Sequence, residues 1–244
     1  MQSRIHLPQC QSTNEELLNL IQQAESPLAE GLLVSTDHQT AGRGQRGSTW
    51  ESEPCKNLLF SLLLRPSFLP MKFAFWLSAA VAIGVREALS EFGINAKVKW
   101  PNDIMVDDSK IGGILIENAT SGSTLDRSIV GIGLNINQTN LPAGACSLAE
   151  LAKTSFDREI VFSKVLESIF HQYYLLKKDG YEKLKLRYYA HLYRMGIVHT
   201  YRLPDSDSFS AILKGITEDG QVVLLTSSGE KRFWFKEVAF ERFE

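Results

Sequence analysis

Residues 41–50, AGRGQRGSTW, combine three glycines with two arginines and end on the aromatic Trp50. Glycine lets the backbone adopt positive φ angles and approach a ligand closely, and the arginine fork matches carboxylate or phosphate. The segment therefore predicts a mobile anion clamp with an aromatic platform at its edge. It lacks the Gly-Lys-Ser/Thr ending of a P-loop and the spacing of a Rossmann turn. Taken alone, it leaves a flexible basic loop as the alternative.

The composition is that of an ordinary soluble protein of one or two domains, with 244 residues, 44% hydrophobic and 22% charged. A net charge of -2 argues against bulk nucleic-acid binding, so no nucleic-acid partner is expected. Cys10, Cys55 and Cys146 are far apart and form no Cys-x-x-Cys pair. This pattern predicts neither a disulfide framework nor a structural zinc site, and it favours a reduced cytoplasm.

No membrane partner is expected either. The N-terminus has no long apolar core, so it does not resemble a signal peptide. The most apolar stretch, residues 73–85, is shorter than the roughly 20 residues that a membrane span needs. We interpret it as part of a buried helix.

Hydrophobic periodicity and turn residues predict the elements of the first 195 residues. Ser12 and Glu15 have the spacing of a capping box at a helix start, and Gly93 is a natural helix end. Helices are expected at 71–92, around 162–173 and at 181–193, and strands at 31–34, 57–64, 96–100, 104–106, 110–117 and 128–137.

The pattern changes after residue 195. Residues 197–244 consist of short apolar segments separated by turn signals at 205–207, 218–220 and 227–229. Such spacing predicts a small antiparallel β-barrel. We therefore expect one domain over 1–195 and a second domain over 196–244.

Three further segments carry polar groups suited to a ligand: Lys99–Asp103 (KWPND), Lys110–Glu117 (KIGGILIE) and Gly131–Asn137 (GIGLNIN). In the second, adjacent glycines within a strand suggest that a ligand or another backbone passes close by. In the third, small residues alternate with apolar ones, so one strand face is expected to be nearly bare. Lys110 could stabilise developing phosphoryl or carboxylate charge. The segments taken singly leave open an Asn-Asp turn, a solvated lysine, and a β-bulge or tight packing against a helix.

The ordered combination of these segments with the clamp resembles the biotin–protein ligases over about residues 8–140. Ser12-Thr13-Asn14 and Gln39 also match that family. The resemblance implies an α/β (α+β) fold with a mixed sheet and flanking helices like that of class II aminoacyl-tRNA synthetases. It also implies an SH3-like C-terminal barrel. The implied activity joins biotin to ATP with Mg²⁺, forms biotinyl-5′-AMP, and transfers biotin to a lysine of a biotin carboxyl carrier protein.

The resemblance also implies roles for individual residues. Lys110 and Arg43 would be catalytic, and Asp103 would lie on the magnesium side. The residues implied in biotin binding are Ser12, Thr13, Asn14, Gln39, Arg43, Gly44, Gln45, Lys110, Gly112 and Gly113, and those implied in nucleotide binding are Arg46, Trp50, Asn102, Asp103 and Asn135.

Two departures from the family pattern carry expectations. Gln45 and Ser48 stand where members often carry arginine, which predicts weaker retention of the adenylate. The Ser-Thr-Asn motif begins at residue 12, so we expect a ligase without the winged-helix domain that some members carry. A lipoate or octanoate ligase of the same superfamily and a non-catalytic adenylate-sensing regulator are the alternatives. Neither the oligomeric state nor the identity of the carboxylase follows from the sequence.

Overall fold

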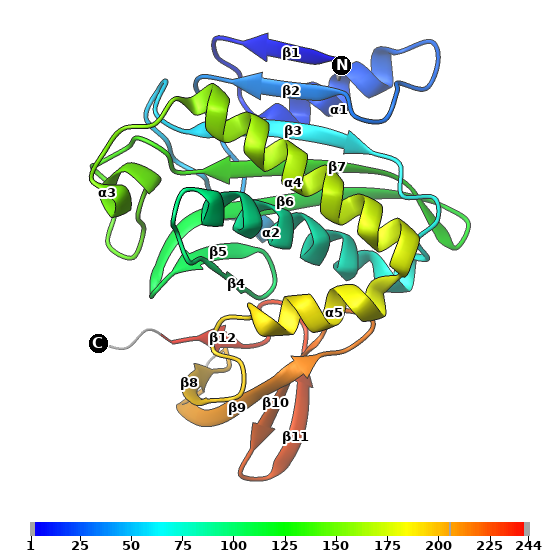
Figure 1. Ribbon diagram of the computed structural model, residues 1–244. Coiled ribbons are helices and arrows are strands. Elements are labelled where there is room, and N and C mark those ends of the chain that lie inside the picture. Colours follow the sequence, from blue (N-terminus) through cyan, green and yellow to red (C-terminus); the bar gives the residue numbers. More distant parts are fainter. Residues whose placement is uncertain (1–2, 205, 242–244) are drawn as a thin grey trace.

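In the computed structural model, which describes residues 3–204 and 206–241, helices cover a large sheet and a smaller sheet packs against its lower end (Figure 1). The large sheet is mixed, because β1 pairs with β2 in parallel while the other neighbours are antiparallel. Its strands, in the order β1-β2-β3-β7-β6-β5-β4, are β1 Arg4–Leu7, β2 Leu33–Thr36, β3 Leu58–Leu64, β7 Thr124–Leu134, β6 Ser109–Ser121, β5 Asp103–Val106 and β4 Lys97–Lys99.

Strand β3 is buried along its whole length because both of its faces are covered. Alternate residues such as Phe60 and Leu62 belong to the large core, which includes helices α2 (Ala74–Glu91) and α4 (Arg158–Asp179). Leu63 faces the other way and packs with Leu17 of α1 (Thr13–Gln23) in a smaller core. The period of two in a strand therefore divides the sheet into a face toward α2 and α4 and a face toward α1.

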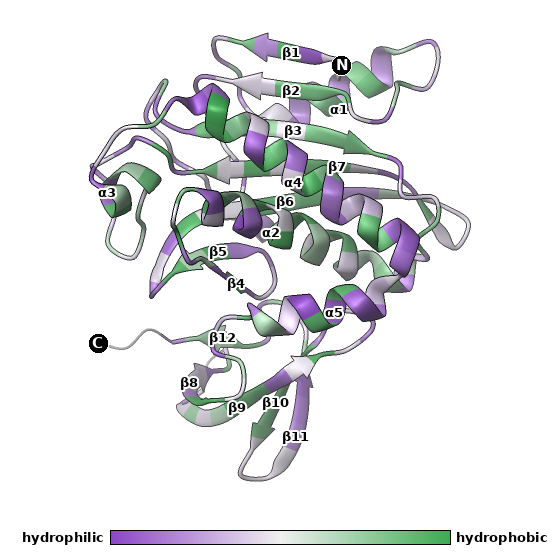
Figure 2. Ribbon diagram, in the orientation of Figure 1, coloured by the Kyte–Doolittle hydropathy of each residue, from purple (hydrophilic) through white to green (hydrophobic). Residues whose placement is uncertain are grey.

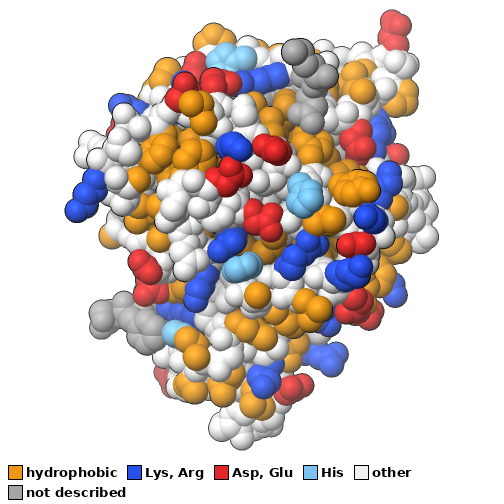
Figure 3. Space-filling view, viewed as in Figure 1, with side chains coloured by type: hydrophobic (Ala, Val, Ile, Leu, Met, Phe, Trp, Pro, Cys, Tyr) orange, Lys and Arg blue, Asp and Glu red, His pale blue; other side chains and the backbone are white. Residues whose placement is uncertain are grey.

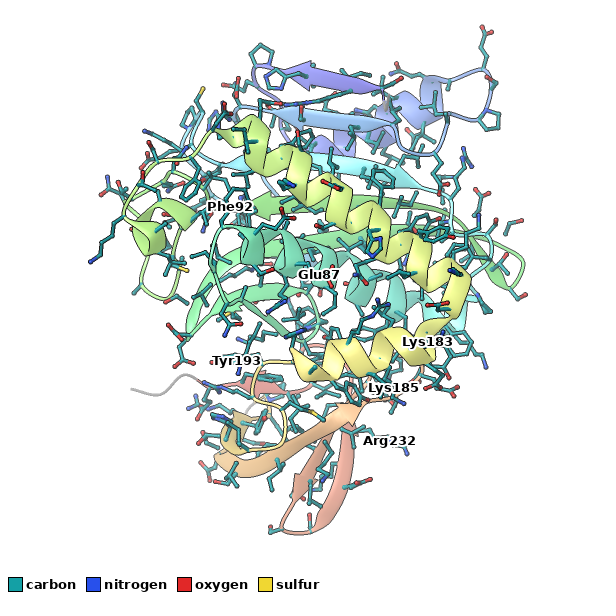
Figure 4. All side chains as sticks on the ribbon, in the orientation of Figure 1. Glu87, Phe92, Lys183, Lys185, Tyr193 and Arg232 are labelled. Carbon is teal, nitrogen blue, oxygen red and sulfur yellow. The ribbon has the colours of Figure 1, made fainter. Side chains whose placement is uncertain are left out.

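Helix α2 follows a 3-10 turn, Met71–Phe73, and lies under α4 across the sheet (Figure 1). Its apolar character is visible in Figure 2. Glu87, labelled in Figure 4, accepts a hydrogen bond from Gln172 of α4 at 2.7 Å. By length and composition Met71–Glu91 could cross a membrane, but 61% of its most apolar window is buried inside the protein. In this fold it is a core helix, as the sequence predicted.

The remaining helices are α3 (Leu148–Ala152) and α5 (Tyr181–Ala190). The C-terminal sheet is five-stranded and antiparallel, in the order β11-β10-β9-β8-β12. Its strands are β8 Val198–Arg202, β9 Ser208–Ile216, β10 Val222–Thr226, β11 Gly229–Phe233 and β12 Ala239–Phe240.

The C-terminal sheet shares its core with the larger part of the protein. Leu213 and Val222 belong to the same buried cluster as Trp76 of α2. Trp76 Nε1 and Trp100 Nε1 donate hydrogen bonds to the carbonyls of Glu218 and Gly220, at 3.0 and 2.9 Å. Buried donors paired across the boundary fix how the two parts pack. The division at residues 195 and 196 remains a prediction.

Most predicted elements are confirmed, and one local detail is wrong. Ser12 is the N-cap of α1, but its side chain makes no capping hydrogen bond. Instead, the Thr13 N–H donates to Gln39 Oε1 at 2.8 Å, so a residue from a later loop satisfies the helix start. Strand β1 and the short helix α3 were not predicted from the sequence. Acidic and basic side chains are interspersed over the face of the molecule seen in Figure 3.

Candidate functional site

A cavity of about 560 Å³ opens between the α1 face of the large sheet, the loop at 41–50 and the C-terminal part of the chain. Such a volume suits a small-molecule ligand. Twelve of the residues that the resemblance implied line this cavity: Ser12, Thr13, Asn14, Gln39, Arg43, Gly44, Gln45, Trp50, Asn102, Asp103, Lys110 and Gly113. The structure thus brings together segments that are separated by up to about 100 residues in the sequence.

Two implied residues do not line the cavity. A Cβ built at Gly112 would meet the Leu134 side chain at 2.8 Å, so this position faces the core, while its neighbour Gly113 faces the cavity. Asn135 is buried just beyond β7, and its Nδ2 donates to the Cys146 carbonyl at 3.0 Å. Neither residue lines the cavity, and their implied binding roles remain predictions. Arg46 lies in the 3-10 turn Gln45–Gly47, and its side chain is outside the described part of the structure.

A chain of buried polar groups connects the N-terminal motif to the sheet. Ser61 of β3 lies 2.7 Å from Thr13 Oγ1 and 2.6 Å from Asn14 Oδ1, and it faces α1 because of its place in the strand. Thr13 Oγ1 donates to Gln39 Oε1 at 3.2 Å. These contacts fix the amide and hydroxyl groups at the cavity wall. The sequence analysis did not identify Ser61, although it is the single polar residue within an apolar strand.

Arg43 is held by two carboxylates that come from other elements. Its Nη2 lies 3.2 Å from Glu117 Oε2, and its Nε lies 3.7 Å from Glu15 Oε1. Glu117 also accepts a hydrogen bond from Asn14 Nδ2 at 2.7 Å. The sequence showed no acidic partner near the arginine because both carboxylates are distant in the chain. Whether the loop at 41–50 is mobile without a ligand remains a prediction.

Lys110 and Asp103 form the charged centre of the cavity. Lys110 Nζ lies 2.6 Å from Asp103 Oδ1 across the β5–β6 hairpin, and both side chains are partly exposed. The same Nζ lies 5.6 Å from the centre of the Trp50 ring. Asn102, which is buried, donates from Nδ2 to the Ile114 carbonyl at 2.6 Å and holds this end of the hairpin. The hairpin therefore presents the lysine to the cavity.

Trp50 lies on the glycine-rich surface of β7. A Cβ built at Gly133 would meet the Trp50 ring at 2.5 Å, and one built at Gly131 would meet Asn14 Oδ1 at 2.3 Å. Close approach thus explains both glycines. For Gly131, the alternative of tight packing against a helix is also correct, since Asn14 belongs to α1. The Trp50 ring and the Asn14 amide therefore cover the strand face that the sequence predicted to be nearly bare.

The C-terminal part closes one side of the cavity, which the sequence analysis did not predict. Phe235, Lys236, Val238, Ala239 and Phe240 contribute to the lining. Phe240 stacks on Trp100 with ring centres 6.3 Å apart. Nothing in the sequence linked these residues to a site more than 100 positions earlier, because the contact depends on how the two sheets pack.

The buried thiol of Cys146 is not a candidate nucleophile. Burial, together with the nearby carboxylates of Glu150 and Asp107, raises the pKa of the Cys146 thiol to about 11. The thiol is therefore neutral near pH 7. The cavity instead offers amides, hydroxyls and the cationic side chains of Arg43, Lys99, Lys110 and Lys236, which suit the binding of a polar ligand and the stabilisation of negative charge.

Comparisons with known proteins agree with this geometry. Residues 7–135 match the biotin/lipoate A/B protein ligase family. A biotin–[acetyl-CoA-carboxylase] ligase from Paracoccus denitrificans is 30% identical over 96% of this chain and 99% of its own length. The bifunctional ligase/repressor BirA of Bacillus subtilis is 30% identical over 95% of this chain and 71% of its own length.

A solved structure supports the same assignment. The biotin protein ligase from Aquifex aeolicus in complex with biotin and ATP superposes with a TM-score of 0.80 at 30% identity, covering 100% of both chains. This match includes the C-terminal sheet as well as the large sheet. On the family match, the two relatives and this superposition, the chain belongs to the biotin/lipoate A/B protein ligase family.

Proposed function

We propose that this chain joins biotin to ATP to form biotinyl-5′-adenylate and then transfers biotin to a lysine of a biotin carboxyl carrier domain. The observation that carries the proposal is the cavity itself, where Lys110 and Arg43 accompany the amides of Asn14 and Gln39. Amides can both donate to and accept from a ureido ring, which has the same groups. The two cations suit the carboxylate and phosphate of the two substrates.

The first step brings two anions together. A carboxylate oxygen of biotin attacks the α-phosphorus of ATP, and the bond to the β-phosphate oxygen breaks, so pyrophosphate leaves with the electron pair. Lys110, partly exposed beside Trp50, can neutralise charge on the attacking carboxylate and on the α-phosphate. Alignment of the two substrates supplies much of the remaining acceleration.

Asp103 is the residue that suits magnesium. Mg²⁺ usually binds through one or two carboxylates together with substrate phosphates and water. Within residues 3–204 and 206–241, no three His, Cys, Asp or Glu side chains converge on one point. A single carboxylate in the cavity therefore fits an ion that arrives with ATP. When bound, the ion would offset phosphate charge, and Asp103 would exchange its contact with Lys110 for one with the ion.

In the second step, the amine of the carrier lysine attacks the acyl carbon of the adenylate, and AMP leaves. The Trp50 ring at the cavity wall would stack beside the planar adenine, and the loop at 41–50 would exclude water from the reactive anhydride. The partner is then a carrier domain with an exposed lysine. We place this reaction in the cytoplasm, where ATP and reduced thiols are available.

Transfer to a carrier tests this proposal. Purified protein is incubated with biotin, MgATP and a biotin carboxyl carrier domain, and labelling is followed by streptavidin blot and by intact mass. We expect labelling of the wild-type carrier, no labelling when its target lysine is arginine, and loss of labelling when EDTA removes Mg²⁺. Labelling that is independent of the target lysine, or no labelling, would contradict the assigned transfer step.

A further inference from the structure

We propose that Glu117 is a positioning residue that holds Arg43 in its ligand-free place and orients the Asn14 amide. The proposal deepens the function assigned above and rests on it for the identity of the ligand. Glu117 contacts both groups at once, with Arg43 Nη2 at 3.2 Å and Asn14 Nδ2 at 2.7 Å from Oε2. Among residues 3–204 and 206–241, it is the one carboxylate with hydrogen bonds to both Arg43 and Asn14.

The position of Glu117 follows from the register of β6. Gly113 and Leu115 line the cavity, and Glu117 is the next residue on the same face because side chains alternate along a strand. Its side chain is 38% exposed, so it reaches from the sheet to the rim where Arg43 lies. Strand β6 thus places a carboxylate at the rim of the cavity, beside Arg43 of the loop at 41–50.

The Asn14 amide can bind in one orientation only. Its Oδ1 lies 2.6 Å from the Ser61 hydroxyl, a donor, and its Nδ2 lies 2.7 Å from a Glu117 oxygen, an acceptor. Reversing the amide would set Oδ1 against the Glu117 carboxylate and the Leu115 carbonyl, which can only accept hydrogen bonds. Because Asn14 is almost fully buried, that mismatch would be costly. Glu117 therefore determines which face of the amide a ligand in the cavity meets.

Arg43 is held loosely enough to be released. Its side chain is 39% exposed, and its distances to Glu117 are at the long end for a charge-assisted hydrogen bond. A phosphate or carboxylate that enters the cavity can offer the guanidinium a stronger bidentate contact. Glu117 then keeps Asn14 in place while Arg43 moves to the ligand. Glu117 thus links binding of the neutral part of the ligand, at Asn14, to binding of its charged group, at Arg43.

Limited trypsin digestion of the ligand-free protein tests the contact without requiring activity. Trypsin must draw the Arg43 side chain out of its contact before it can cleave after this residue. We expect Glu117→Gln to raise cleavage after Arg43 about threefold to tenfold relative to cleavage after Arg46. The matched control is Glu15→Gln, which removes the more distant carboxylate and should change that ratio by less than about twofold. Equal acceleration of both cuts, or no change, would overturn the proposal.

Adenylation kinetics give the second readout. With Glu117→Gln, we expect the KM for biotin to rise about tenfold, because the Asn14 amide loses its charged acceptor, while the KM for ATP changes far less. Glu117→Asp retains the charge and should recover part of the loss. A general loosening of the fold would lower kcat without separating the two KM values, and that result would overturn the positioning role. If the wild type shows no biotin-dependent activity, the assigned function fails while the digestion still tests the contact.

Discussion

Lys110 Nζ lies 2.6 Å from Asp103 Oδ1, so the cation expected to act on the substrates is paired with a carboxylate before any ligand arrives. The pair joins the two strands of one hairpin, at the point where Asp103 is opposite Gly113 in the register. This arrangement keeps the lysine extended toward the cavity. It also keeps Asp103 close to where substrate phosphates would bind.

Replacing Lys110 by alanine should abolish adenylation while leaving the fold intact. A fixed cation at developing phosphoryl charge is worth several kcal/mol, so we expect a rate loss of at least about 100-fold. The pair is partly exposed, so the free energy of unfolding should change by less than about 1 kcal/mol. Pyrophosphate release and urea denaturation measure the two effects. Lys56→Ala, an exposed lysine away from the cavity, is the control. Near-normal pyrophosphate release by the Lys110→Ala variant would show that Lys110 has no catalytic role.

Replacing Gly133 by alanine should destabilise the protein through Trp50. The added Cβ would lie 2.5 Å from the indole ring, so we expect a loss of about 1–3 kcal/mol in the free energy of unfolding. In a Trp50→Ala background the ring is gone, and the same substitution should cost much less. Urea denaturation of the four proteins of this cycle measures the coupling. Equal costs in both backgrounds would show that the ring does not rest on Gly133.

Replacing Tyr189 by phenylalanine should weaken the attachment of the C-terminal sheet. The Tyr189 hydroxyl accepts from the Ile216 N–H at 2.7 Å and donates to the Ile216 carbonyl at 2.9 Å. Its removal leaves both groups without this partner, at a cost of about 1–3 kcal/mol. Tyr174→Phe, at an exposed position on α4, should cost less than about 0.5 kcal/mol. Thermal denaturation that fails to separate the two variants would argue against the contact.

Replacing Gln45 by arginine should reduce escape of the adenylate. Gln45 lines the cavity, so an arginine there can reach the phosphate. We expect biotin labelling of an unrelated bystander protein to fall about threefold to tenfold. Ser227→Arg adds the same charge at an exposed turn of the C-terminal sheet and should leave labelling unchanged. If both variants label the bystander as the wild type does, residue 45 does not control retention.

The sequence predicted best what depends on local pattern. Strand β3 and helix α2 follow from their apolar runs, and the alternating glycines of β7 predicted a nearly bare strand face before its partners were known. The face of β6 that lines the cavity was harder to predict, because Gly112 and Gly113 are adjacent and the sequence alone does not show which of them faces the ligand. Asn135 matched the family pattern, yet beyond the strand end its amide turns to the Cys146 carbonyl.

Contacts across the fold were beyond the reach of sequence patterns. Glu117 meets Asn14 across 103 residues and Arg43 across 74, and nothing local marks it as different from any other strand glutamate. Ser61 was overlooked because a serine inside an apolar strand has many structural explanations. Phe235 and Phe240 reach the cavity only through the packing of one sheet against the other. Such features require the register of the sheet and the arrangement of both parts of the chain.

Substrate-dependent release of pyrophosphate tests the central claim most directly. The purified protein is supplied with MgATP alone, with biotin, or with lipoate or octanoate at the same concentration, and pyrophosphate is measured in a coupled assay. We predict release only with biotin, at a rate at least about 100-fold above that with either of the other acids. Equal release with lipoate or octanoate would assign the cavity to the other acids of this superfamily. No release with biotin would contradict adenylation altogether.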